Sequence, residues 1–123
     1  MKRLPDTELE VMKALWATDP DTPRSLLEER LAGFGWASNT VNTYLSRLSD
    51  KGFVSARREG KSNLYTPLIG QEEYQAFDSR AVLDRLYGSP RNFVAALARE
   101  GMRQEELEEL RALLDQLNGG QGQ

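Results

Sequence analysis

This 123-residue chain contains neither cysteine nor histidine. The lack of cysteine excludes disulfides, zinc ribbons and thiol nucleophiles. The lack of histidine removes the commonest general base and the commonest transition-metal ligand. Long apolar runs are also missing, because no stretch approaches the roughly 18 residues that a membrane-spanning helix needs. These absences argue against most enzyme classes and predict a cytoplasmic protein with no catalytic residues, metal, cofactor or membrane insertion.

The composition is that of an ordinary folded protein, with 39% apolar residues, 28% charged residues and a formal net charge of −3. This length allows one domain or two small coupled subdomains. Basic residues are unevenly placed: five of them lie within residues 47–61, against two acidic ones. Such a patch is compatible with a bound polyanion at one face, and charge alone fits a solvated surface equally well.

Apolar periodicity predicts three helices in the first half of the chain. A capping-box spacing at Thr7 opens the first, and Thr22–Pro23 reads as an N-cap and first helical residue of the second. Ser38 is the expected cap of the third. Two extended runs, 53–57 and 63–66, are joined by a loop that contains glycine, which indicates a β-hairpin. Three helices followed by a hairpin is the order of a winged helix-turn-helix.

The second half reads as helical throughout. A long helix is predicted at 71–87 with apolar residues on more than one face, a second starts at Ser89–Pro90, and a third covers 103–118. The predicted fold is therefore mainly α with a small β-hairpin wing. It divides into a winged helix-turn-helix DNA-binding domain at 1–70, a helical dimerisation domain at 71–118 and a disordered tail at 119–123.

Leucines in the last predicted helix form a two-heptad seam that this short arm cannot cover alone. We therefore expect the arm to pair with a second copy of the chain across a two-fold axis. The residues expected in this contact are Phe93, Leu97, Leu107, Leu110, Leu114 and Leu117.

The third predicted helix has two contrasting faces at 100° per residue. Val41, Leu45 and Leu48 form the core face, while the opposite face carries short polar side chains and arginine, the types that bond base edges and phosphates. A solvated helix would more often carry Glu, Lys and Gln there. The candidate DNA contacts are Asn39, Thr40, Asn42, Thr43, Ser46 and Arg47 on this helix, with Arg57, Arg58 and Lys61 in the wing.

The sequence also carries specific family motifs. The stretch 4–16, LPDTELEVMKALW, resembles the opening helix of the penicillinase-repressor family of the BlaI/MecI type. Trp36 to Thr43, Lys51–Gly52 and Tyr65 to Leu68 continue the likeness, as do motifs in the helical half. The resemblance implies a homodimeric transcriptional repressor that binds an inverted-repeat operator in double-stranded DNA. In such a complex the helix at about 38–51 would lie in the major groove, and the wing 57–62 would contact the DNA backbone.

Three departures from the family pattern bear on function. Ser38 and Asn39 stand where members usually have Pro and Lys, so the operator preference of the family is not carried over to this chain. The absence of cysteine excludes the copper-responsive branch. In the penicillin-responsive branch an Asn-Phe bond is cleaved, and alignment places Ala96-Leu97 there, with Asn92-Phe93 four residues too early. The resemblance thus implies an upstream sensor or protease as a partner, which the sequence does not identify.

Two other classes of function compete with DNA binding. A winged-helix protein-interaction module is favoured slightly by the acidic balance, whereas the Thr/Asn/Arg face favours DNA. An enzyme is the remoter rival, since adjacent acid pairs such as Glu28-Glu29 and Glu72-Glu73 point in different directions on a helix and are expected to be solvated. Gel-shift binding to upstream DNA would separate the first two.

Overall fold

The computed structural model describes residues 1–18 and 20–121, and in these ranges the chain forms α-helices with a three-stranded antiparallel sheet. The chain divides into two compact units, Met1–Ser79 and a second that begins at Arg80. The boundary lies within helix α4 (Gln71–Val82), later than the expected 70–71. It lies there because the start of α4 packs on the first unit through Tyr74, which is buried in its core.

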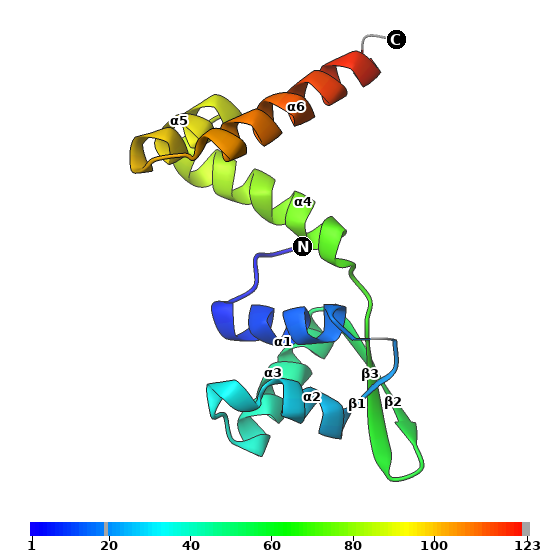
Figure 1. The fold of residues 1–123 in the computed structure, drawn as a ribbon. Coiled ribbons are helices and arrows are strands. Elements are labelled where there is room, and N and C mark those ends of the chain that lie inside the picture. Colours follow the sequence, from blue (N-terminus) through cyan, green and yellow to red (C-terminus); the bar gives the residue numbers. More distant parts are fainter. Residues whose placement is uncertain (19, 122–123) are drawn as a thin grey trace. The chain divides into compact units, whose positions relative to one another are not determined.

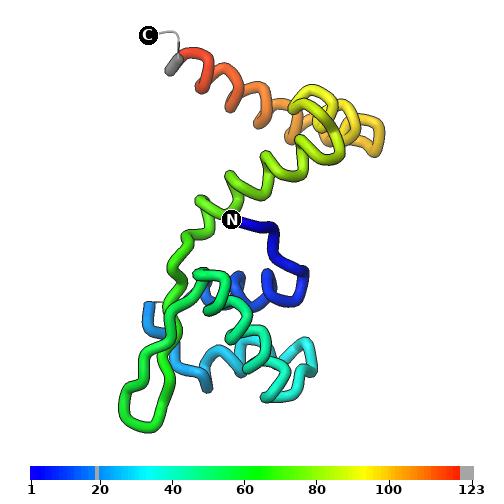
Figure 2. Tube along the Cα trace, turned by 180° about the vertical axis from the view of Figure 1, so that it is seen from behind, coloured from blue at the N-terminus to red at the C-terminus, as the bar shows by residue number. Residues whose placement is uncertain are grey.

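The first unit contains three helices and the sheet (Figure 1). In chain order the elements are α1 (Asp6–Trp16), β1 (Thr22–Pro23), α2 (Arg24–Arg30), the short 3-10 helix η1 (Ala32–Phe34), α3 (Ser38–Asp50), β2 (Val54–Glu59) and β3 (Ser62–Pro67). β2 and β3 form the predicted hairpin, whose tip extends beyond the helices of this unit (Figure 2). The winged helix-turn-helix fold expected from the sequence is confirmed.

The helix starts differ from the sequence predictions. Pro5 and Ala37, which have no side-chain oxygen, are the N-caps of α1 and α3, so neither Thr7 nor Ser38 caps its helix. Thr22 is not a helix cap either: it lies in β1, buried and paired with Tyr65 of β3. Pairing with a distant strand overrides the local Thr-Pro signal, because that signal reports only the preference of a short segment for a helix start.

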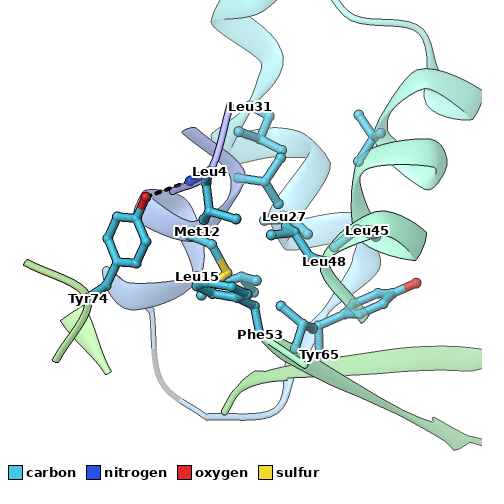
Figure 3. Close-up of a cluster of buried hydrophobic side chains, with 13 residues drawn as sticks. Leu4, Met12, Leu15, Leu27, Leu31, Leu45, Leu48, Phe53, Tyr65 and Tyr74 are labelled. Carbon is cyan, nitrogen blue, oxygen red and sulfur yellow. Dashed lines mark hydrogen bonds between the residues drawn. The ribbon is translucent and has the colours of Figure 1, made fainter. Parts of the chain in front are cut away.

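One apolar core holds the three helices and the hairpin together, with Met12 and Leu15 of α1, Leu27 of α2, Leu48 of α3 and Phe53 among its buried side chains (Figure 3). Burying each such side chain contributes about 1.5–3 kcal/mol relative to leaving it in water.

The ends of the first unit are tied together at this core. The Tyr74 hydroxyl of α4 accepts a hydrogen bond from the Leu4 amide at 2.7 Å (Figure 3). Trp16 places its indole N–H on the Ile69 carbonyl at 2.9 Å, so its polar group is satisfied. Arg3 forms an ion pair with Asp78 at 2.6 Å. These contacts attach the first part of α4, and Ile69 just before it, to α1 and the segment that precedes α1.

In its described residues, 80–121, the second unit contains helices and no strand. After Val82 the chain widens into a π-helical turn, η2 (Leu83–Tyr87), and α5 (Pro90–Glu100) and α6 (Gln104–Gln121) follow. Ser89 caps α5 as predicted, accepting from the Asn92 amide at 3.1 Å. α6 includes residues 119–121, the start of the predicted disordered tail, because each further residue of a formed helix adds a hydrogen bond. The last two residues of that tail lie outside the described ranges.

From Arg80 onward, no residue whose burial is described is buried. Across the described ranges, none of the helices has both the length and the apolar character needed to cross a bilayer.

Candidate nucleic-acid interface

α3 places the predicted polar face outward. Val41, Leu45 and Leu48 are buried, with 3% exposure or less, which confirms the core face predicted from periodicity. Among the six candidates on this helix, Thr40 is half-buried and the other five are exposed: Asn39, Asn42, Thr43, Ser46 and Arg47. Apart from Thr40, the side chains predicted to contact DNA are therefore directed to solvent.

Two side chains on this face, Thr43 and Arg47, differ in whether they form hydrogen bonds within the protein. Thr43 donates its hydroxyl to the Asn39 carbonyl one turn earlier, at 3.0 Å, which fixes its rotamer. The side chain of Arg47 makes no hydrogen bond or ion pair with any described residue. All five donors of its guanidinium are therefore available to an external acceptor.

A groove separates α3 from the wing. Polar and apolar side chains of the two elements line it: Asn42, Leu45, Ser46, Ser49 and Asp50 of α3, and Ala56, Asn63 and Tyr65 of the hairpin. The polar face of α3 therefore continues into a groove bounded on its other side by the β2–β3 hairpin. Its one acidic lining residue, Asp50, would repel a phosphate and accept from a base amino group.

Strand alternation sorts the wing cations onto two faces. Arg58 lies opposite Asn63, and directly paired residues share a face, so Arg58 is on the side of the groove. Arg57 lies opposite Leu64 and therefore points to the other side. There it meets two carboxylates, Asp21 at 3.3 Å and Glu59 at 3.1 Å.

Lys61 lies at the tip of the hairpin. It is exposed and makes no hydrogen bond or ion pair with any described residue. Arg58 has one polar partner, the Gly60 carbonyl at 3.3 Å. The structure thus places Arg58 on the side of α3, leaves Lys61 at the hairpin tip and directs Arg57 to the other face.

A hydrogen-bond network joins α2 to α3 and was not predicted from the sequence. Arg24 donates through Nη1 to the Asn42 carboxamide oxygen, and through Nη2 to the Ser38 carbonyl at 2.8 Å and the Glu28 carboxylate at 3.2 Å. The Ser38 hydroxyl donates to Glu28 at 2.6 Å. The only sequence signal was the Arg24/Glu28 spacing of four residues, which places the pair on one helix face.

This network has an electrostatic signature at Glu28. The hydrogen bond from the Ser38 hydroxyl, with the nearby Arg24 charge, lowers the pKa of Glu28 below its usual value. Glu28 is therefore more than a solvated member of an acid pair, because its charged form links the helix before the turn to the start of α3.

The predicted dimerisation residues lie on α5 and α6. Phe93 is half-buried against Tyr87, with ring centroids 5.0 Å apart, and Leu110 is half-buried. The other four are exposed: Leu97, Leu107, Leu114 and Leu117 are 43%, 41%, 56% and 52% exposed. The Ala96-Leu97 bond lies inside α5.

Comparison with known proteins gives consistent similarities. A family model described as penicillinase repressor matches residues 4–116. The penicillinase repressor of Bacillus licheniformis is 31% identical over 121 residues, 94% of each chain. The transcriptional regulator BlaI of Mycobacterium tuberculosis is 32% identical over 126 residues, 99% of this chain and 90% of that protein. The solution structure of the DNA-binding domain of the repressor BlaI matches with a TM-score of 0.52 and 33% identity, over 60% of this chain and 94% of that one.

Proposed function

The chain belongs to the penicillinase repressor family of DNA-binding transcriptional repressors, which are not enzymes, and on this basis we propose that it binds an inverted-repeat operator as a homodimer. α3 enters the major groove, whose width accommodates one α-helix. Asn39, Asn42, Thr43, Ser46 and Arg47 face the base edges and adjacent phosphates. The observation that carries this assignment is the outward short-polar face of α3, which lines a groove with the wing.

The wing holds the flanking backbone through Arg58 and Lys61. Both cations are on the side of α3 or at the hairpin tip, and no carboxylate among the described residues is paired with either. Arg57, one of the cations expected from the sequence to bind DNA, is left out of this contact. Its charge is already balanced by Asp21 and Glu59 on the opposite face.

Dimerisation is supported by the lack of a core in the helical arm. Exposed leucines on α5 and α6 lie in a unit where no residue of described burial is buried. A helical pair gains stability by burying an apolar stripe, and a second copy of the chain supplies the same stripe across a two-fold axis. Two winged helices held in this way read two half-sites at a fixed spacing.

The salt dependence of binding tests the proposal. DNA from the protein's own upstream region is titrated with the full chain at 50–200 mM salt. If the dimer neutralises about 6–10 phosphates, affinity falls roughly 10³–10⁵-fold over that range. Lys61→Ala should lower the logarithmic salt slope by about 2, one unit for each wing.

Arg57→Ala is the matched control, since it removes one positive charge from the same hairpin on its other face. It should leave the slope close to that of the wild type. A wild-type slope near zero would refute DNA binding and favour a protein-interaction module. Equal slope changes for the two variants would refute the assignment of the wing faces.

A further inference from the structure

Asn42 has an exposed side chain on α3 that lines the groove, yet its carboxamide is not unconstrained. Arg24, from the helix before the turn, donates to its side-chain oxygen. Because a guanidinium carries only donors, the group that faces it must be the oxygen and not the nitrogen of the amide. The amide nitrogen and oxygen diverge from one carbon atom, so the NH₂ group of Asn42 is directed away from Arg24.

Arg24 is itself held firmly in place. Its Nη2 atom bonds the Ser38 carbonyl at the start of α3 and the Glu28 carboxylate one turn along α2. Glu28 in turn accepts from the Ser38 hydroxyl at 2.6 Å. The side chain of Arg24 is only 20% exposed. The orientation of Asn42 is therefore imposed by protein contacts that exist before any DNA is bound.

We propose that Arg24 determines base specificity by turning Asn42 into a hydrogen-bond donor that reads guanine. The inference rests on the proposed function, since it requires α3 in the major groove. An unconstrained asparagine typically reads adenine with both ends of its amide, the oxygen accepting from N6 and the nitrogen donating to N7. The oxygen of Asn42 faces Arg24, so the NH₂ group is the end of the amide that Asn42 presents to a base.

The four bases respond differently to such a donor. Guanine presents two adjacent acceptors, O6 and N7, which match the N–H groups of Asn42. Adenine places its own N6 amino group beside N7, so two donors would meet there. Cytosine offers a donor only, and thymine offers a single acceptor beside a methyl group. Arg24 is therefore a positioning residue that never needs to touch the base whose identity it sets.

The experiment is selection from a duplex library with randomised base pairs, using the full-length chain. Comparing the wild type with Asn42→Ala identifies the base pair whose preference depends on Asn42. At that pair we expect the wild type to prefer G·C over A·T by roughly 10- to 100-fold, the range of one good base contact. Arg24→Met should shift this preference towards A·T, because the released amide can then contact adenine with both ends.

Arg30→Met, a loss of charge on the same helix, is the matched control and should leave the base preference unchanged. A second variant keeps the network intact and so avoids any effect of Arg24→Met on folding. In Asn42→Asp, Arg24 still holds one oxygen while the other accepts, so the preferred base should change to cytosine, whose N4 is a donor.

Four outcomes would overturn the inference. A wild-type preference for A·T at the Asn42-dependent pair, or an unaltered preference in Arg24→Met, contradicts it directly. If Asn42→Ala selects the same sequence as the wild type, the inference fails while the proposed function stands. If the wild type selects no sequence at all, the proposed function fails with it.

Discussion

The Glu8 carboxylate shows what a single ion pair contributes inside the first unit. Glu8 on α1 is 2% exposed and meets the Lys51 ammonium, just after α3, at 2.5 Å. Lys51→Met leaves a buried carboxylate without its partner, and because Lys51 is itself partly exposed we expect a loss of about 2 kcal/mol in the free energy of unfolding. Urea denaturation of the full chain, followed by tryptophan fluorescence, measures it.

Lys13→Met is the control for that change. Its partner Glu10 is 34% exposed at 3.2 Å, and exposed pairs contribute at most about 1 kcal/mol. A loss in Lys51→Met no larger than in Lys13→Met would show that Glu8 tolerates burial alone.

A pH dependence follows from Glu28. Its folded pKa is lowered, chiefly by the Ser38 hydroxyl, from an ordinary value of 4.5. The ionised carboxylate therefore stabilises the fold above pH 4.5, and that contribution disappears as pH falls through the lower folded value. Glu28→Gln should destabilise the chain at neutral pH, and the difference from the wild type should shrink below pH 4.5.

Thermal unfolding at a series of pH values measures this difference, with Glu29→Gln as the control for a charge lost from the same helix. If the difference between wild type and Glu28→Gln stays constant down to pH 3, the network does not depend on the charge of Glu28.

At the scale of elements, α3 should carry the sequence preference. Arg47 is exposed with its donors available, and Thr43 has a fixed rotamer on the same face. Arg47→Ala and Thr43→Ala should each weaken the complex with a selected operator by about 1–3 kcal/mol and affect random DNA less, because phosphate contacts act on all sequences alike. Competition titrations with the two DNAs measure both losses.

Lys61→Ala gives the contrasting pattern, since a wing–phosphate contact should weaken operator and random DNA equally. If Arg47→Ala and Thr43→Ala also lower the two affinities by the same factor, α3 is not reading bases.

Elements with a strong local pattern could be predicted from the sequence. The apolar spacing of α3 and the Ser-Pro start of α5 each determine their element without outside help, and both are confirmed. β1 could not be predicted, because its two residues are a strand only by pairing with Tyr65 and Leu64 of β3. The same limit applies to η2, where nothing local marks the change to π-helical bonding at Leu83.

In the candidate site, too, the features set by local sequence could be predicted and those set by distant contacts could not. The composition of the α3 face was sufficient to predict which side chains point outward. The opposite surroundings of Arg57 and Arg58 were not accessible, because the strand register and the position of Asp21 decide them. Likewise Arg24 and Asn42 are 18 residues apart, and only the turn between α2 and α3 brings them together.

For the whole molecule, the proposed dimer makes DNA binding depend on the arm. Leu110→Glu would place a charge in the leucine seam of α6, where an unpaired buried charge costs several kcal/mol. We expect a monomer by sedimentation, retained helical circular dichroism from the first unit with its own core, and operator binding lost or greatly weakened. Leu114→Glu repeats the test at a side chain that is 56% exposed in the single chain.

Ala112→Glu places the same charge on the opposite side of α6 and should leave a dimer. The arm does not form the dimer contact if both leucine variants sediment as dimers. The same conclusion follows if a monomeric variant binds the full operator with normal affinity.

Because the arm has no core of its own, operator occupancy should depend steeply on the concentration of the chain. While most chains are single, the number of pairs grows with the square of the chain concentration, so a modest fall in synthesis empties the operator more sharply than a one-to-one binder would allow. Single chains also expose leucine-rich helices that have little to hold them folded, and such segments are the first that cellular proteases reach. The repressor would thus be cleared fastest when it is scarce, which gives its target genes a threshold rather than a graded response.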